Sequence, residues 1–207
     1  MTAAEAIGIM GGTFDPIHVG HLAVAEEARE ALSLDRVLFI PAGQPPHKLP
    51  GSVTAVAHRV AMVERAIADN PAFELSTIEI DRNGPSFTVD TVEALARALP
   101  EATLHLIVSA ETFGELPTWH EPERLFEAAR VAVVPREGYP APDPAWLAEA
   151  FPGREDRVDF LEGPRLGLSS TALRGRVAAG RSIRYLVPAA VGAYIAQHEL
   201  YRRLPAQ

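Results

Sequence analysis

Residues 7–21 read IGIMGGTFDPIHVGH. The apolar run Ile7–Met10 is typical of a buried strand, and the residues from Gly20 onward have the spacing of a helix. Between them lies a loop with small residues, which lets a backbone approach a ligand closely. A strand–turn–helix of this kind directs free backbone N–H groups and the positive end of a helix dipole at an anion. His18 and His21 lie at the same end of this expected helix and add donors for phosphate oxygens. We therefore predict a nucleotide site here.

Apolar runs recur along the rest of the chain and alternate with segments of helical period. We expect strands at Ile7–Met10, Val37–Pro41, Phe73–Ile80, Leu104–Val108, Val131–Pro135 and Val158–Leu161. We expect helices over 20–32, 55–69, 88–98, 121–129, 169–179 and 188–198. This alternation predicts an α/β fold with a doubly wound parallel sheet, in which ligands bind at the carboxyl ends of the strands.

Two segments between these elements are rich in proline and glycine. Residues 41–54 are long for a simple connection, so we expect them to form a lid or flap. Residues 136–156 are expected to form a surface excursion.

Composition narrows the class of protein. The chain has 207 residues, of which 47% are hydrophobic and 22% charged, as in an ordinary globular protein. We expect one domain over 1–207. A formal charge of −8 argues against binding to nucleic acid, and the lack of cysteine excludes thiolate chemistry. The sequence has no apolar run of about 20 residues that could span a membrane and no evident signal peptide, so a cytoplasmic location is expected.

A second phosphate-binding pattern lies near the C-terminus. Ser169, Ser170 and Thr171 offer hydroxyls and free N–H groups at the start of a helix, and Arg174 follows one turn later. Two familiar motifs, the P-loop and the G-x-G-x-x-G fingerprint of dinucleotide binding, are absent from the sequence. A cofactor-dependent hydride transfer is therefore disfavoured. The alternative interpretation of this pattern is an ordinary capped helix with a solvated arginine, without a role in binding phosphate.

Together, GGTFDPIHVGH and SSTALR resemble the nucleotidyltransferase superfamily with the (H/T)xGH signature, which has a Rossmann-like fold. Four further stretches are similar to bacterial nicotinic acid mononucleotide adenylyltransferases, and they occur in the same order: PPHK (45–48), GPSFTVDT (84–91), PTWHEPERLF (117–126) and SIRYLVPAAVGAYIAQHELY (182–201). The resemblance implies transfer of AMP from ATP to nicotinic acid mononucleotide, with deamido-NAD and pyrophosphate as products. It also implies that Mg²⁺ arrives with the triphosphate. A small helical part, 169–207, would complete the phosphate site.

The resemblance also assigns roles to individual residues. The backbone of the nucleotide turn and the two histidines would contact the phosphates of ATP, with His21 stabilising charge in the transition state; these are Gly12, Thr13, Phe14, His18 and His21. The loop and the C-terminal helix would hold the same phosphates through His47, Lys48, Ser170, Thr171 and Arg174. The nicotinate group would be recognised by Thr88, Trp119 and the backbone of His120, with its ring stacked on the indole.

Some alternatives stay open at this point. Thr88 could be a helix N-cap, Trp119 a core aromatic, and the two histidines a loop histidine and a cap. Ser109 and Glu111 stand where the family usually has Gly-x-Asp, which puts their expected contacts to adenosine in doubt. Another adenylyltransferase of the superfamily, such as one acting on phosphopantetheine, and a non-catalytic nucleotide-binding module are the competing functions. A homo-oligomer is compatible with the sequence.

Overall fold

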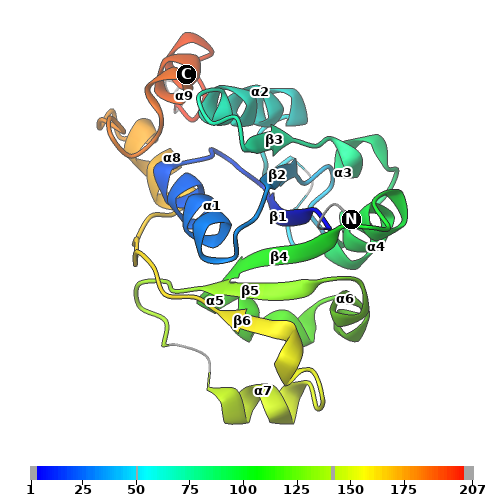
Figure 1. Ribbon diagram of the computed structural model, residues 1–207. Helices are drawn as coiled ribbons and strands as arrows, with labels where there is room; N and C mark the ends of the chain where they lie inside the picture. The colour runs from blue at the N-terminus through cyan, green and yellow to red at the C-terminus, as the bar shows by residue number, and fades with distance from the viewer. Residues whose placement is uncertain (1–3, 50, 141–142, 203–207) are drawn as a thin grey trace.

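The computed structural model describes residues 4–49, 51–140 and 143–202. At its centre lies a six-stranded parallel sheet with the strand order β3-β2-β1-β4-β5-β6, which runs from top to bottom in Figure 1. The strands are β1 (Ala6–Gly12), β2 (Arg36–Pro41), β3 (Phe73–Leu75), β4 (Thr103–Ser109), β5 (Arg130–Val134) and β6 (Val158–Phe160). The chain builds outward from β1 to β3 and then returns to the other side of β1 with β4. The order therefore reverses between β1 and β4, as predicted for a doubly wound sheet.

Helices connect the strands and cover both faces of the sheet (Figure 1). The α-helices are α1 (Val19–Ala31), α2 (Val56–Ile67), α3 (Ile78–Asp81), α4 (Thr88–Ala98), α5 (Ala110–Gly114), α6 (Pro122–Ala128), α7 (Pro144–Ala150), α8 (Ser170–Ala178) and α9 (Ala189–Gln197). Two 3₁₀ turns, η1 (Leu116–Thr118) and η2 (Glu155–Arg157), complete the described elements.

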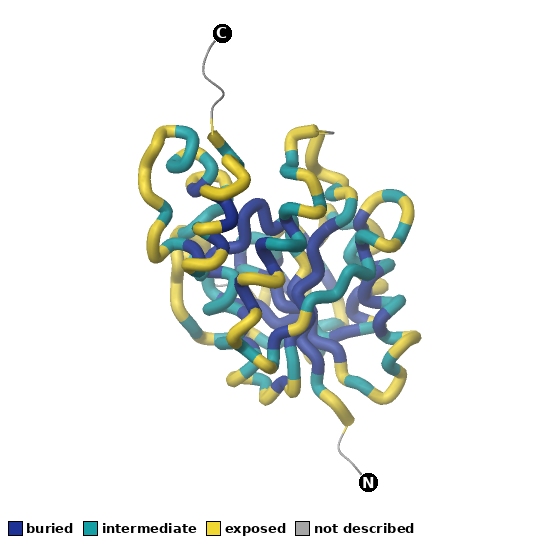
Figure 2. Tube along the Cα trace, turned by 90° about the horizontal axis from the view of Figure 1, so that it is seen from above, coloured by how far each residue is buried: buried dark blue, intermediate teal, exposed yellow. Residues whose placement is uncertain are grey.

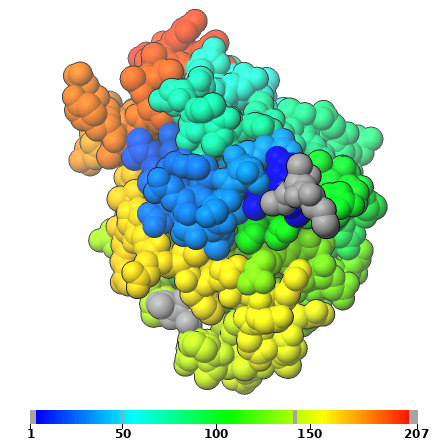
Figure 3. All heavy atoms as spheres, in the orientation of Figure 1, coloured from blue at the N-terminus to red at the C-terminus, as the bar shows by residue number. Residues whose placement is uncertain are grey.

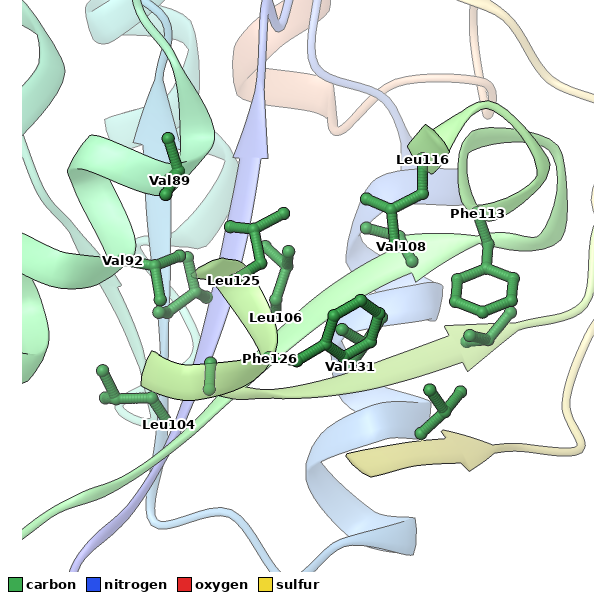
Figure 4. Close-up of a cluster of buried hydrophobic side chains, with 14 of the residues drawn as sticks. Val89, Val92, Leu104, Leu106, Val108, Phe113, Leu116, Leu125, Phe126 and Val131 are labelled. Carbon is green, nitrogen blue, oxygen red and sulfur yellow. The ribbon is translucent and has the colours of Figure 1, made fainter. Parts of the chain in front are cut away.

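Side chains that alternate along the strands divide the core between the two faces. Ile7 and Ile9 of β1 lie in one buried cluster, together with apolar residues of α4, α5, α6 and α7. Ten residues of this cluster are labelled in Figure 4. Met10 lies in a second cluster on the opposite face, which α1, α2, α8 and α9 cover. Figure 2 shows the resulting pattern, with buried backbone inside and exposed segments around it. Strands buried on both faces explain why the sequence shows continuous apolar runs.

One predicted strand is wrong in its second half. The strand expected over Phe73–Ile80 ends at Leu75, and residues Ile78–Asp81 form the short helix α3. The alternation of apolar and polar residues in FELSTIEI mimics a strand. In this region the backbone at Glu79 lies so close to Gly43 that a Cβ on Gly43 would clash with the carbonyl oxygen of Glu79.

The described residues of the excursion expected over 136–156 are mostly exposed, as predicted, but the segment also contains a helix that packs on the core. This helix is α7, which Pro144 begins and Asp143 caps by accepting a hydrogen bond from the N–H of Ala145 at 2.9 Å. Leu147 and Phe151 are both buried and join the core cluster of α4 to α6. This segment therefore contributes to packing.

The C-terminal helix α9 packs against α2, and Figure 3 shows these orange-to-red residues beside the teal ones of α2. No helix among the described residues is both long and apolar enough to cross a lipid bilayer.

Candidate active site

A cavity of about 370 Å³ opens at the carboxyl ends of β1, β2, β4 and β5. A second hollow of about 410 Å³ is lined by the nucleotide turn, loop 41–54 and the start of α8. Thr13 and His21 line both spaces, so the two hollows adjoin at this turn. Parallel sheets of this type bind ligands where the strand order reverses, which is here between β1 and β4.

His18 and His21 lie at the start of α1 with their rings stacked, 3.7 Å between centroids and 19° between planes. His18 is the N-cap residue, and its backbone N–H donates to Nδ1 of His21 at 3.1 Å. Because Nδ1 accepts this hydrogen bond, the proton of the neutral His21 ring is carried on Nε2. Nδ1 of His21 therefore caps the helix, as one alternative expected, while the role of its Nε2–H as a donor to a phosphate oxygen stays a prediction.

Both imidazoles are neutral at physiological pH. Burial, with a further contribution from the charge of Arg136, lowers the pKa of His18 to about 4. Burial and the neighbouring His18 ring hold the pKa of His21 well below its ordinary value. Nδ1 of His18 is buried and has no hydrogen-bond partner among the described residues. Neutral rings of this kind donate N–H groups without repelling each other, and a bound polyphosphate would favour their protonation.

The turn after β1 has little spare room. Phe14 is buried, has a φ of +50° and meets the His21 ring edge-on at a centroid distance of 5.2 Å. A Cβ on Gly12 would lie 3.0 Å from the Phe14 ring, and one on Gly20 would lie 3.0 Å from Nδ1 of His18. These glycines let the backbone and the His18 ring pack closely around the predicted phosphate position.

The start of α8 is tied directly to this turn. Ser169 caps the helix, its Oγ accepting from the N–H of Ala172 at 3.2 Å. Oγ of Ser170 donates to the carbonyl of Pro16 at 2.9 Å. Arg174 donates to the carbonyl of Asp15 at 2.7 Å and to Oγ1 of Thr171 at 3.2 Å.

The structure therefore brings the two phosphate-binding patterns of the sequence together. Thr171, Arg174 and Lys48 line the second hollow with Thr13 and His21. Their roles as phosphate ligands stay predictions.

Loop 41–54 borders both hollows. His47 lines the main cavity, and Lys48 lines the second. The first part of the loop is fixed to the segment before α4, because Gln44 and Ser86 exchange two hydrogen bonds of 2.9 and 3.0 Å. The residues that follow, His47 and Lys48, are exposed. This arrangement suits the expected lid, with a fixed base and an exposed tip.

The predicted nicotinate end of the main cavity contains Thr88 and Trp119. Phe87 takes the N-cap position of α4, so Thr88 is the first residue of the helix and the N-cap alternative for it is wrong. Trp119 packs against the core cluster, as the alternative for it expected, and it also lines the cavity, so its stacking on nicotinate stays a prediction. The exposed His120 ring stacks on Phe87, with 4.3 Å between centroids.

A buried carboxyl at this end was missed by the sequence reasoning. Glu79 lines the cavity, is 5% exposed and accepts a hydrogen bond from Oγ1 of Thr91 at 2.8 Å. Burial raises the pKa of this carboxyl. In the sequence, Glu79 lies where apolar and polar residues alternate, and such a pattern predicts that the glutamate faces solvent.

The opposite end of the cavity is formed after β4 and β5. Ser109 lines it and caps α5 by accepting from the N–H of Thr112 at 3.2 Å. Glu111 is not among the residues that line either hollow, and it pairs with Nε of Arg136 at 2.8 Å. Arg136 does line the cavity, together with Pro135, Pro164, Leu166 and Leu168. The sequence reasoning missed these residues, which come from irregular segments.

Comparison with known proteins identifies the family. A family model described as cytidylyltransferase-like matches residues 9–176. A probable nicotinate-nucleotide adenylyltransferase of Roseiflexus sp. (strain RS-1) is 55% identical over 200 residues, which cover 97% of this chain and 100% of that protein. The chain belongs to the nicotinate-nucleotide adenylyltransferase family.

Further members of this family extend the likeness over nearly all of the chain. A probable nicotinate-nucleotide adenylyltransferase of Thermus thermophilus is 47% identical over 197 residues, covering 95% of this chain and 99% of that protein. A solved structure of Plasmodium falciparum nicotinic acid mononucleotide adenylyltransferase complexed with NaAD matches the fold with a TM-score of 0.81 at 20% identity, covering 95% of this chain and 97% of the other. The Rossmann-like fold expected from the sequence is thereby confirmed.

Proposed function

We propose that this member of the nicotinate-nucleotide adenylyltransferase family transfers AMP from ATP to nicotinic acid mononucleotide, forming deamido-NAD and pyrophosphate for NAD biosynthesis. A phosphate oxygen of the mononucleotide attacks the α-phosphorus of ATP. The bond between this phosphorus and the oxygen that bridges to the β-phosphate breaks, and pyrophosphate leaves. Since the substrate supplies its own nucleophile, the protein has to position two nucleotides and stabilise charge.

The observation that carries this proposal is the meeting of the two hollows at Thr13 and His21. The lining of one hollow includes Trp119 and Thr88, which suits an aromatic acid, and the other is lined by Lys48 and Arg174, which suits polyphosphate. The reacting phosphates would then lie where the hollows adjoin. Nε2–H of His21 would donate to the α-phosphate as charge develops on it.

The remaining residues keep the roles that the family resemblance gives them, and most of them line one of the two hollows, while His120 and Glu111 line neither. Polyphosphate would be held by the backbone of the nucleotide turn, by the loop and by α8, through Gly12, Thr13, Phe14, His18, His47, Lys48, Ser170, Thr171 and Arg174. Thr88, Trp119 and the backbone of His120 would bind nicotinate. Ser109 would contact adenosine directly, and Glu111 would act through Arg136, which it pairs with at 2.8 Å.

Magnesium would enter with the triphosphate. The described parts of the chain contain no group of three or more acidic or histidine side chains placed to hold a metal ion. Asp15 is close to the second hollow, but its carboxylate already accepts hydrogen bonds from Thr54 and Tyr201. We therefore expect the phosphate oxygens of ATP to supply the main ligands of Mg²⁺. The cytoplasm as the location and a homo-oligomeric state stay predictions.

The test is a pyrophosphate-release assay with ATP and one of three acceptors: nicotinic acid mononucleotide, nicotinamide mononucleotide or phosphopantetheine. We expect release with the first and much less with the others. Preference for phosphopantetheine would contradict the proposed substrate, and binding of ATP without release from any acceptor would favour a non-catalytic module.

A further inference from the structure

A buried arginine joins three segments that surround the second hollow. Arg59 of α2 is 2% exposed. Its guanidinium donates to the carbonyls of Thr13 at 2.9 Å, Ala42 at 2.7 Å and Thr54 at 3.0 Å. Thr13 belongs to the nucleotide turn, while Ala42 and Thr54 lie at the two ends of loop 41–54. One side chain thus fixes both ends of the loop relative to the turn.

A second set of contacts holds the same turn from the C-terminal side. The carboxylate of Asp15, which is 4% exposed, accepts from the N–H of Thr54 at 3.1 Å and from the hydroxyl of Tyr201 at 2.7 Å. Burial lowers the pKa of Arg59, and the negative charge of Asp15 opposes that shift. The turn, the end of the loop and the C-terminal segment are therefore linked through buried polar groups.

This arrangement depends on the shape of the guanidinium as well as on its charge. The donors of arginine point outward in a planar fork, so one group can reach three carbonyls that face it from different segments. Lysine carries the same charge on a single nitrogen and cannot reproduce all three contacts. A buried carbonyl without a hydrogen-bond donor costs free energy of folding. A residue that replaces Arg59 and does not donate to all three carbonyls should therefore disturb their arrangement.

We propose that Arg59 is a positioning residue for nucleotidyl transfer, and that it acts with Asp15 and Tyr201 to set the distance between the nucleotide turn and the loop that carries His47 and Lys48. This inference rests on the proposed function for its kinetic readout. None of the three residues needs to touch the reacting atoms. Their effect is to hold Thr13 and the base of the loop in the arrangement in which both hollows adjoin.

Two conservative variants test this idea, each with a matched control. Arg59→Lys keeps the charge and removes the fork. Its control is Arg65→Lys on the same helix, because exposed Arg65 donates to the carbonyl of Ala61 within α2 and lies over the ring of Tyr194, without a hydrogen bond to the described residues of the turn or the loop. Tyr201→Phe removes one hydroxyl, and its control is Tyr194→Phe, whose hydroxyl is paired with His58 at 2.9 Å away from the turn. Small displacements of catalytic groups cost up to about 100-fold in rate. We expect kcat/KM for ATP to fall about 10- to 100-fold in Arg59→Lys and about 3- to 10-fold in Tyr201→Phe.

Three further readouts separate positioning from simple destabilisation. Affinity for a non-hydrolysable ATP analogue, measured by calorimetry, should fall in both variants and not in the controls. Amide hydrogen exchange should accelerate in the turn 13–16 and in loop 41–54 while the core strands keep their protection. Added guanidinium ion should restore part of the activity of Arg59→Ala and none in Arg65→Ala.

The proposal is overturned if the two variants match their controls in kcat/KM and in exchange, or if activity falls only in proportion to the folded fraction. Failure of the proposed function would look different. The wild-type protein would then release no pyrophosphate with nicotinic acid mononucleotide, while the analogue affinity and the exchange pattern would still decide the role of Arg59.

Discussion

The division of labour between the two nitrogens of His21 leads to a specific prediction. Nδ1 accepts the N–H of His18 at 3.1 Å and so caps α1, while Nε2 carries the proton that, under the proposed function, would be donated to the phosphates. His21→Asn places an oxygen near the Nδ1 position and removes the distal donor. His21→Gln does the reverse, because its amide nitrogen lies near the Nε2 position. His21→Ala removes both.

The magnitudes follow from what each variant loses. Removing one preorganised donor to a developing negative charge costs about 10²- to 10³-fold in kcat, or about 3–4 kcal/mol. Removing a capping acceptor costs about 1 kcal/mol of stability. We therefore expect His21→Asn to keep its melting temperature and lose about 10²- to 10³-fold in kcat. His21→Gln should be about 1 kcal/mol less stable and keep kcat within about 10-fold. His21→Ala should lose both turnover and about 1 kcal/mol, with the fold intact.

The assay combines steady-state pyrophosphate release at saturating ATP and mononucleotide with thermal unfolding of the same samples. The reasoning is refuted if His21→Asn retains near-normal kcat, or if Asn and Gln reduce kcat equally. Either result would mean that Nε2 does not supply the stabilising donor.

Three other predictions concern pH, the nicotinate end and the base of the loop. Because the pKa of His18 is about 4 in the folded state against 6.5 when unfolded, the unfolded state binds its proton first. The contribution of His18 to stability without ligand should be constant above about pH 6.5 and fall by up to about 3 kcal/mol between pH 6.5 and 4. Denaturant titrations should therefore find a smaller loss over this range in His18→Asn than in the wild-type protein. Trp119→Ala should raise KM for nicotinic acid mononucleotide about 5- to 150-fold, as expected for a lost stacking partner, and change KM for ATP by no more than about twofold; equal effects on both would argue against stacking. Gly43→Ala should destabilise by about 1–3 kcal/mol because its Cβ would clash with the carbonyl oxygen of Glu79. Gly114→Ala, where nothing lies within 4 Å of the added Cβ, serves as the control in chemical denaturation and should show much less loss.

The sheet could be predicted from sequence because its strands are buried on both faces and therefore appear as apolar runs bounded by helical periods. The error over Phe73–Ile80 has a local cause. FELSTIEI alternates like a strand, but after Leu75 the chain packs Glu79 against the glycine of another loop. The alternation of residue types gives no information about that contact, because the glycine lies in a different part of the chain.

The phosphate side of the site was visible for a similar reason. His18, His21 and Ser169 all sit at helix starts, where sequence patterns are informative. Arg136, Leu166 and Leu168 are brought to the cavity by irregular segments, which have no period to recognise.

Arg59 is an intermediate case, because the sequence does hold a signal for it. It precedes Met62, Val63 and Ala66 at the i, i+3, i+4 and i+7 spacing, so a charged residue occupies a position on the apolar face of α2. Its burial was predictable from this spacing. Its three carbonyl partners were not, since they come from distant parts of the chain.

The links between the first turn and the last residues have a consequence for synthesis of the protein. Ser170 reaches Pro16 across 154 positions of sequence, and Tyr201 reaches Asp15 across 186. Chains grow from the N-terminus and begin to fold while they are made. A nascent chain can therefore form β1 and α1 early, but it lacks α8 and Tyr201 until those residues have been synthesised. The predicted phosphate site cannot reach the arrangement described above before both segments are present.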